Sequence, residues 1–109
     1  MNKKPSHIEF KDKSLQEAFS FLRTGDNSQR ELYKFIEQAF TNIEENFFCG
    51  TQIPKRLIPK EYKQYPNLWK YDLPRAWRLI YTVRGNDIEV VSLVLEWMDH
   101  TNYERRFNY

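Results

Sequence analysis

The chain has 109 residues, a formal net charge of +2 at pH 7 and a single cysteine, Cys49, and 17% of its residues are aromatic. This length predicts a single domain spanning residues 1–109, and the aromatic content argues against a wholly disordered chain, because disorder requires few aromatic side chains. The lone cysteine excludes an intrachain disulfide and a cysteine metal cluster, and without a signal region or a run of roughly 20 apolar residues we expect a cytoplasmic protein that does not enter a membrane.

Two elements are predicted before Gly25. A short alternating segment, His7–Lys11, predicts a first strand. Ser14 and Glu17 then have the spacing of a capping box, in which two side chains satisfy free backbone N–H groups at a helix start. Apolar residues at helical intervals over Leu15–Leu22 predict the helix itself, and Gly25 can end it in the left-handed conformation.

The strongest periodic pattern in the chain predicts a second, longer helix. Ser28 and Glu31 again have capping-box spacing, and Phe48–Gly50 ends the pattern. The apolar residues between them follow the helical repeat: Leu32, Phe35, Ile36, Ala39, Phe40, Ile43 and Phe47. The two helices are separated by a short turn, so we expect an antiparallel helical hairpin whose apolar stripe packs on a sheet.

The segment Thr51–Pro66 is rich in proline and in basic residues. Pro54 and Pro59 exclude a central strand and a long helix here. A short edge strand near Gln52–Ile53 or near Arg56–Ile58 is compatible with these prolines, and so is one helical turn after Pro59. We therefore expect an exposed segment with little regular structure.

The next stretch predicts two strands joined by a tight connection at Pro74–Arg75. Asn67–Leu73 alternates between two faces, and Trp77–Val83 continues as a β-forming run. Within the second strand one arginine, Arg78, projects from the face opposite to that of Trp77. A charged side chain in an otherwise β-forming run is a candidate for function.

The last part of the chain completes the predicted sheet. Arg84–Asp87 has the composition of a hairpin turn, and Ile88–Leu95 is apolar on both faces after its second residue, which indicates a central strand covered on both sides. Asp99–Tyr109 is a polar tail that predicts one or two helical turns. The fold class is α+β: a helical hairpin packed on a small, mostly antiparallel sheet of four or five strands, in the order β-α-α-β-β-β.

The cationic side chains gather in the second half of the chain. Residues 51–109 carry ten Lys/Arg against seven Asp/Glu, whereas residues 1–50 carry seven against eight. The candidates in this half are Lys55, Arg56, Lys60, Lys63, Lys70, Arg75, Arg78, His100, Tyr103, Arg105 and Arg106. Such side chains can cleave RNA without a metal or another cofactor: a base removes the 2′-hydroxyl proton, cations stabilise the charge around phosphorus, and an acid protonates the leaving 5′-oxygen.

Each candidate also has a structural interpretation. Arg78 can form a salt bridge across the sheet to Asp72 or Glu96. Tyr103 can pack the tail against the sheet, and His100 can be a solvated side chain. Three tryptophans are expected in the core rather than as platforms for bases: Trp69, Trp77 and Trp97. Taken together, the candidates still favour a phosphate-binding surface.

The segment Trp77–Tyr81, WRLIY, resembles the RLVY-type strand of the RelE/ParE toxin superfamily. The turn and apolar strand that follow it, and the tail sequence Tyr103–Arg106, YERR, are similar to that family too. The resemblance implies a RelE-like fold and the toxin of a type II toxin–antitoxin system. In the RelE branch such toxins cut messenger RNA in the ribosomal decoding site without a metal. In the ParE branch they inhibit DNA gyrase, and a cognate antitoxin holds both kinds inactive.

The leading hypothesis from this resemblance is an endoribonuclease of the mRNA interferase type, which inhibits translation. Arg78 matches the arginine that contacts phosphate in the RNase branch, and Tyr103 matches the tail tyrosine. Lys70 corresponds to a basic residue on the preceding strand, and His100 is a further candidate for proton transfer. Six other residues are candidates for RNA phosphate binding: Lys55, Arg56, Lys60, Arg75, Arg105 and Arg106.

An alternative without RNase activity stays open. Asp72 and Pro74 stand where RelE-type enzymes carry basic residues, and Trp97 stands near the position of their last-strand arginine. These departures favour a RelE-fold binding protein, either a gyrase inhibitor or an inactive toxin homologue, and a helix–sheet domain serving another complex is the third hypothesis. Either toxin hypothesis implies a hetero-oligomer with an antitoxin, for which we expect an acidic, partly disordered segment that wraps the basic face.

Overall fold

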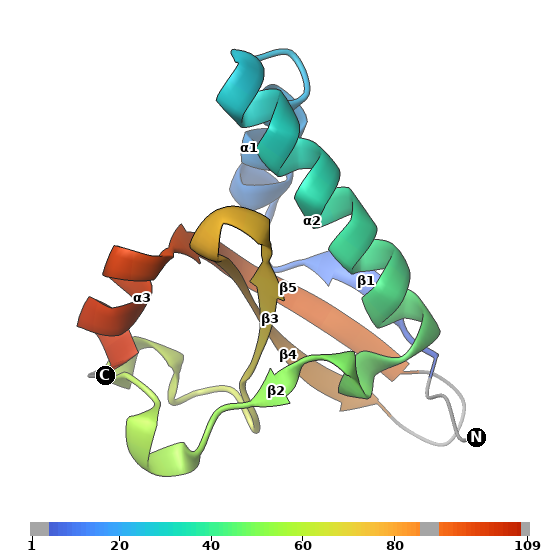
Figure 1. Cartoon of the computed structure of the whole chain (residues 1–109). Helices are drawn as coiled ribbons and strands as arrows, with labels where there is room; N and C mark the ends of the chain where they lie inside the picture. The colour runs from blue at the N-terminus through green and yellow to red at the C-terminus, as the bar shows by residue number, and fades with distance from the viewer. Residues whose placement is uncertain (1–4, 86–89, 108–109) are drawn as a thin grey trace.

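A five-stranded sheet forms the middle of the protein in the computed structural model, which describes residues 5–85 and 90–107. The strand order across the sheet is β1 (His7–Phe10), β5 (Val90–Asp99), β4 (Trp77–Gly85), β3 (Trp69–Leu73) and β2 (Thr51–Gln52). β1 runs parallel to β5, and the other neighbouring pairs are antiparallel (Figure 1). The predicted α+β class with a mostly antiparallel sheet is confirmed.

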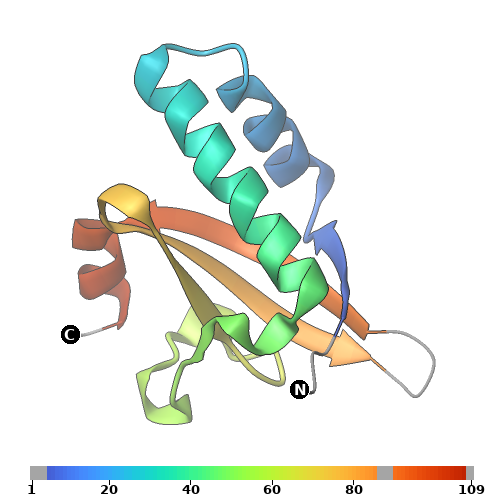
Figure 2. The same cartoon turned by 45° about the vertical axis from the view of Figure 1, so that its right-hand side comes forward.

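Two helices cover one face of this sheet. α1 (Lys13–Leu22) and α2 (Asn27–Glu45) form the predicted hairpin, and its tip projects beyond the sheet (Figures 1 and 2). α2 buries apolar residues that its helical pattern predicted: Leu32, Ile36, Ala39 and Ile43. They share a core with Leu79, Tyr81 and Val94 of the sheet, and the three tryptophans belong to or pack against this core, as expected.

Both hairpin helices begin at an aspartate rather than at the predicted serines. The Asp12 carboxylate accepts a backbone N–H of the first turn of α1 at 2.8 Å. The Asp26 carboxylate accepts the N–H of Gln29, and Gln29 Oε1 accepts the N–H of Asp26, both at 2.9 Å, which completes a capping box. The predicted boxes at Ser14 and Ser28 are therefore wrong, because an aspartate two residues earlier is already a strong cap and leaves each serine inside the first turn.

Gly25 also has a different role from the predicted one. α1 ends at Leu22, and the next residue, Arg23, keeps a right-handed φ of −62°. No glycine in the described part of the chain has a positive φ. A Cβ on Gly25 would lie 2.1 Å from Gln29 Oε1, because that side chain folds back into the capping box. A close approach, rather than a left-handed backbone, therefore explains this glycine.

The opposite face of the sheet is covered by the C-terminal helix and the proline-rich segment. α3 (His100–Phe107) buries Tyr103 and Phe107, and the segment 53–66 contributes Ile53 and Tyr62 to the same core. Beneath them lie Leu68, just before β3, and four residues of the sheet: Ile80, Leu93, Leu95 and Met98. β5 lies between β1 and β4 and is covered on both faces, which confirms the predicted central strand.

The proline-rich segment has little regular structure, as predicted. The edge strand near Gln52 is confirmed as β2, which pairs with β3. The alternative strand at Arg56–Ile58 is wrong, since Lys55–Leu57 forms a short 3-10 turn after Pro54. A second such turn, Lys60–Tyr62, follows Pro59 as expected. A proline stands just before each turn. Because proline has no backbone N–H to donate to a neighbouring strand, the chain turns at these positions rather than extending the sheet.

The boundaries of the last two strands differ from the prediction. β4 continues to Gly85, and the rest of the predicted turn Arg84–Asp87 lies outside the described residues, as does the start of the predicted strand Ile88–Leu95. β5 continues past Leu95 to Asp99, where α3 begins directly. The strand is longer because Trp97 and Met98 still pack on opposite faces of the sheet.

The connection between β3 and β4 is a 3-10 turn, Pro74–Ala76. Within it Arg75 and Ala76 have φ values of 60° and 62°, in the left-handed region that is uncommon for residues other than glycine. The turn reverses the chain so tightly that Asp72 pairs with Arg78 in the register of the two strands. This register determines which charged side chains meet on the face beneath α3.

Candidate active site

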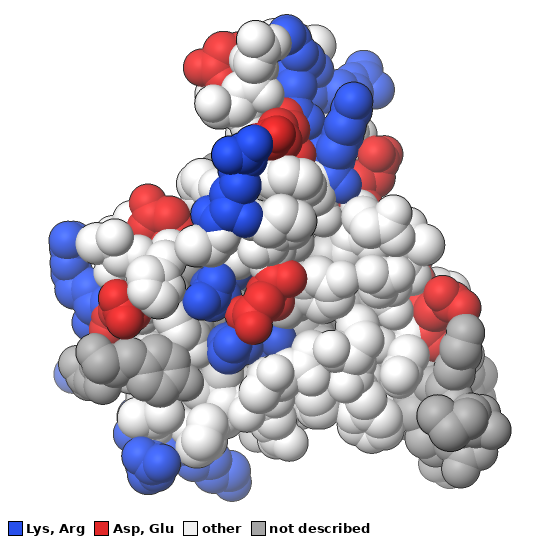
Figure 3. Space-filling model, viewed as in Figure 1, with Lys and Arg blue, Asp and Glu red and all other residues white. Residues whose placement is uncertain are grey.

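Five side chains from three elements meet where β3, β4 and α3 come together. We call Lys70, Asp72, Arg78, His100 and Tyr103 the acid–base cluster. Strand alternation places Lys70 and Asp72 on the same face of β3, and Asp72 stands opposite Arg78 on β4. α3 follows β5 without a linker, which brings its first residue, His100, beside Arg78. Figure 3 shows basic and acidic side chains side by side over this region.

The Asp72 carboxylate lies at the centre of the charges in the cluster. Its Oδ1 is 2.9 Å from Lys70 Nζ and 3.0 Å from Arg78 Nε. The side chain of Asp72 is 58% exposed, whereas those of Lys70 and Arg78 are only 18% and 17% exposed. Two cations therefore lie against the sheet beneath a carboxylate that faces solvent.

Arg78 is held more by charge than by hydrogen bonds. Its Nη1 donates to the carbonyl oxygen of Trp77 at 3.3 Å. In the part of the chain that the structure describes, the buried Nε–H has no hydrogen-bond partner, although Asp72 Oδ1 is near, because proximity alone does not give the required direction. This buried Nε cannot reach a ligand, so an anionic ligand would have to contact the 17% of the side chain that is exposed, where the planar fork of a guanidinium group suits phosphate.

His100 lies between a cation and a carboxylate. Its Nδ1 is 3.4 Å from Arg78 Nη2, and its Nε2 is 3.1 Å from Glu104 Oε1, one turn along α3. A guanidinium group can only donate hydrogen bonds, so Nδ1 is the acceptor and the proton of the neutral ring is on Nε2, facing Glu104. The imidazole is oriented at both nitrogens, and its ring is about half exposed. It can therefore reach a ligand bound at Arg78.

Tyr103 covers the two cations from the side of α3. Arg78 Cζ and Lys70 Nζ lie 5.6 Å and 5.9 Å from the centre of its ring, within the range of a cation–π contact. The residue is 2% exposed, and its ring stacks on Phe107 at 4.6 Å between centroids. Tyr103 therefore packs the tail on the sheet, as the structural interpretation predicts. It also lies beside the cations of the cluster.

The predicted phosphate-binding residues divide into two groups. Lys55, Arg56 and Lys60 are exposed on the proline-rich segment, on the same side of the sheet as α3, and Arg105 is exposed on α3 itself. The other two arginines are engaged in ion pairs away from the cluster. They are Arg106 and Arg75. Arg106 binds Glu96, with 2.8 Å between Nη1 and Oε1.

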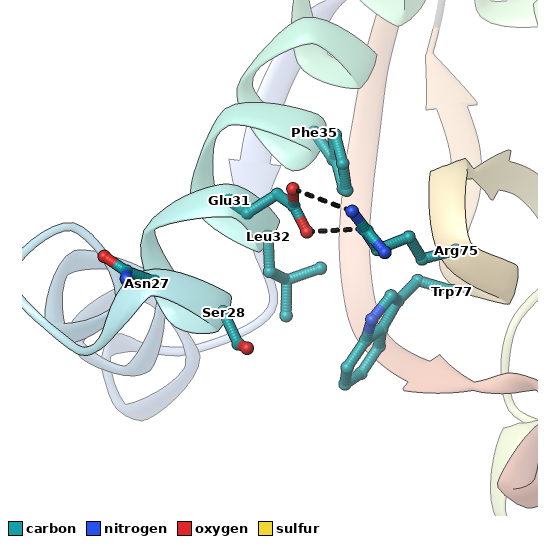
Figure 4. A pocket seen from close by; sticks show the side chains of 7 residues that line it. All are labelled: Asn27, Ser28, Glu31, Leu32, Phe35, Arg75 and Trp77. Carbon is teal, nitrogen blue, oxygen red and sulfur yellow. Dashed lines mark hydrogen bonds and ion pairs between the residues drawn. The ribbon is translucent and has the colours of Figure 1, made fainter.

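Arg75 lies across a cleft between the start of α2 and the β3–β4 connection. Its Nε is 2.6 Å from Glu31 Oε1, and its Nη2 is 3.4 Å from Oε2 (Figure 4). The cleft has a volume of about 490 Å³ and is lined by Asn27, Ser28, Glu31, Leu32, Phe35, Arg75 and Trp77. This ion pair ties the hairpin to the strained connection, on the opposite side of the sheet from the acid–base cluster.

Asp72 was not among the predicted site residues and stood out in the sequence only as a departure from a basic pattern. The register between the two predicted strands could have identified Asp72 as a neighbour of Arg78. A connection of only three residues between two alternating strands places Asp72 opposite Arg78. The possible Arg78–Asp72 salt bridge was the part of that geometry that the sequence did indicate.

Two further findings apply to residues 5–85 and 90–107. Within these ranges no three His, Cys, Asp or Glu side chains are grouped so that they could hold a metal ion. No helix there combines the length and the apolar character needed to cross a membrane.

Comparison with known protein families connects this geometry to a class of proteins. A family model described as "ParE toxin of type II toxin-antitoxin system, parDE" matches residues 12–96. The match begins at the cap of α1, includes Lys70, Asp72 and Arg78, and stops before α3. Neither curated proteins nor solved structures gave a significant match. The resemblance to the RelE/ParE superfamily that the sequence suggested is confirmed.

Proposed function

The chain belongs to the ParE toxin family of type II toxin–antitoxin systems, and from this premise we propose that it inhibits translation as an endoribonuclease that cuts ribosome-bound messenger RNA without a metal. The observation that carries the proposal is the contact of Arg78 with both Asp72 and His100. A carboxylate, a guanidinium group and an imidazole in contact are the three parts that RNA cleavage by general acid–base catalysis needs.

The order of these groups suits an in-line displacement at phosphorus. Asp72 removes the proton of the 2′-hydroxyl as that oxygen bonds to phosphorus. His100 acts as the acid with a second proton on Nδ1, the nitrogen that faces Arg78, and gives that proton to the 5′-oxygen as the bond from that oxygen to phosphorus breaks. The products are a 2′,3′-cyclic phosphate and a 5′-hydroxyl end. Arg78 lies between the base and the acid and, with Lys70, stabilises the negative charge on the phosphorane.

The remaining cations would hold the RNA backbone. Lys55, Arg56 and Lys60 lie on an exposed segment that packs beside α3, and Arg105 is exposed on α3. Lysine and arginine in such positions supply affinity without reading the base sequence. We therefore assign to them binding of the message outside the scissile bond.

A second function, inhibition of DNA gyrase, also has an observation in its favour. Lys70 and Arg78 are largely covered and both pair with Asp72, and Tyr103 is buried. Cations engaged in this way also fit a toxin that acts by binding a protein. The family description, which names ParE, agrees with this alternative.

The test compares both activities in wild type and two variants. Arg78→Ala should lower the rate of mRNA cleavage by about 10²-fold or more, since it removes a preorganised charge from the transition state. Arg84→Ala, on the exposed end of the same strand, is the matched control and should cleave like wild type. RNA ends mapped after cleavage should carry a 5′-hydroxyl. Supercoiling inhibition with intact mRNA would instead establish the gyrase alternative.

ParE toxins pair with a cognate ParD antitoxin, and we propose a partner segment of acidic character for this chain. Its charge would complement the cations of the segment 53–66 and of α3. Co-purification of the two proteins, followed by dissociation at raised ionic strength, tests the proposal. A complex whose affinity does not change with salt would contradict it.

A further inference from the structure

A second polar cluster joins α3 to the sheet, apart from the acid–base cluster. We call Tyr62, Glu96 and Arg106 the clasp. The Tyr62 hydroxyl donates a short hydrogen bond to Glu96 Oε1. Arg106 Nη1 donates to the same Glu96 oxygen at 2.8 Å and to the Tyr62 hydroxyl at 3.0 Å. Each of the three groups therefore contacts the other two.

The clasp connects three segments that are distant in the chain. Tyr62 lies in the proline-rich segment, Glu96 lies on β5, and Arg106 lies in the last turn of α3. Tyr62 is only 5% exposed, and its ring stacks on Phe107. Burial and the hydrogen bond to Glu96 raise the pKa of the Tyr62 phenol, so the hydroxyl stays a donor well above neutral pH.

α3 depends on such contacts for its position. A helix of eight residues is not stable alone in water, so packing must hold it. Its apolar contacts, through Tyr103 and Phe107, are strong but non-directional and tolerate small rotations. Hydrogen bonds lose strength steeply with angle, so the clasp restricts rotation where the apolar contacts do not.

The two ends of α3 have different tasks. The first residue, His100, faces Arg78, and Arg106 in the last turn enters the clasp. Because both residues belong to one short helix, a rotation that breaks the clasp also moves His100. We propose that Tyr62, Glu96 and Arg106 are positioning residues, which fix the orientation of α3 and thereby hold His100 Nδ1 at the Arg78 guanidinium group. For catalysis this inference rests on the proposed function, but the geometry itself can be tested without it.

The experiment uses the full chain and two variants of the clasp. Glu96→Gln removes the charge that Arg106 binds, and Tyr62→Phe removes only the hydroxyl. Glu61→Gln is the matched control, because Glu61 is exposed and lies 3.8 Å from the same arginine, outside the close contacts. If Glu96→Gln does not fold, Tyr62→Phe carries the test.

The first measurement is the tautomer of His100, read from long-range ¹H–¹⁵N correlation spectra of the imidazole. In wild type and in Glu61→Gln the ring should carry its proton on Nε2. In the clasp variants the His100 signals should shift toward a mixture of tautomers, while those of His7 on β1 stay unchanged as an internal reference. Unchanged His100 signals in a folded clasp variant would overturn the proposal.

The second measurement is mRNA cleavage. A displaced general acid should lower kcat by about tenfold or more, since small misplacements of reacting groups are costly, with KM changed by no more than about twofold. Equal kcat in wild type and folded clasp variants would overturn the catalytic part of the inference. If wild type itself cleaves no RNA, the proposed function fails, and the tautomer measurement still decides whether the clasp orients His100.

Discussion

Asp72 and Arg78 face each other across β3 and β4, with 3.0 Å between Asp72 Oδ1 and Arg78 Nε. The proposed mechanism gives Asp72 a role opposite to the one that a comparison of charges suggests. An acidic residue in a basic position would weaken phosphate binding if it stood alone. Beside Lys70 and Arg78 it is a carboxylate oriented at the edge of a cationic site, where a general base is useful.

Asp72→Asn tests this role. The amide keeps the size of the side chain but cannot accept a proton, so cleavage should fall by about 10²–10⁴-fold. RNA binding, measured by filter retention or fluorescence anisotropy, should stay the same or strengthen because a negative charge is removed. Glu9→Gln, an exposed acid-to-amide change on β1, is the control. Unimpaired cleavage by Asp72→Asn would show that another group is the base.

Substitutions of Tyr103 separate its ring from its hydroxyl. Tyr103→Phe keeps the aromatic face over Arg78 and Lys70, so cleavage should stay close to wild type, and stability should change by no more than about 1 kcal/mol. Tyr103→Ala should destabilise the fold by about 3–5 kcal/mol, as expected for a buried aromatic residue. Urea denaturation and cleavage rates measure both effects. A folded Tyr103→Phe protein that no longer cuts RNA would instead identify the hydroxyl as the acid.

Two buried tyrosines predict how stability depends on pH. Burial is the largest cause that raises the pKa of both Tyr62 and Tyr81 above the ordinary value of about 10. The folded state therefore keeps protons that the unfolded chain loses, and stability present below pH 10 declines as the pH rises further. The denaturation midpoint of the wild-type protein should therefore fall as the pH is raised from 8 to 11. The midpoint of Tyr62→Phe should fall less steeply, because one of the two tyrosines is gone. A midpoint independent of pH across this range would contradict the prediction.

Ala76 offers a test of the strained connection. Its φ of 62° lies in the left-handed region, where a side chain costs about 1–2 kcal/mol and glycine does not. Ala76→Gly should stabilise the protein by a net amount of up to about 1 kcal/mol, because glycine also gains entropy in the unfolded chain. Ala18→Gly, exposed in α1, is the control and should destabilise by about 0.5–1 kcal/mol. Equal loss of stability in both variants would mean that Ala76 is not strained.

Local patterns were enough to predict most of the fold. Helical periodicity identified α2 and its buried Ile36 and Ile43, and alternation identified β3 and β4. The helix starts were wrong because aspartate and serine are comparable caps, and periodicity does not choose between positions two residues apart. Boundaries depend on which single side chain turns back onto the backbone, and that choice is made in three dimensions.

The candidate site could be predicted only in part. Lys70, Arg78, His100 and Tyr103 were identified from the sequence and do meet in the structure. The sequence could not separate them from Arg106, because the structure pairs Arg106 with Glu96 on β5 and with the hydroxyl of Tyr62, which is 44 residues away. The charge of a residue is visible in the sequence, but its counter-ion depends on packing.

The parallel pairing of β1 with β5 also affects how the protein can fold during synthesis. His7 stands opposite Val91, so the first strand cannot complete the sheet until the fifth strand exists. Contacts between residues so distant in the chain form slowly, because a long loop must close before they contribute stability. A nascent chain that ends before β5 lacks the strand that leads directly into α3 and His100. The toxin therefore cannot assemble the cluster around Arg78 until the codons for β5 and α3 have been translated.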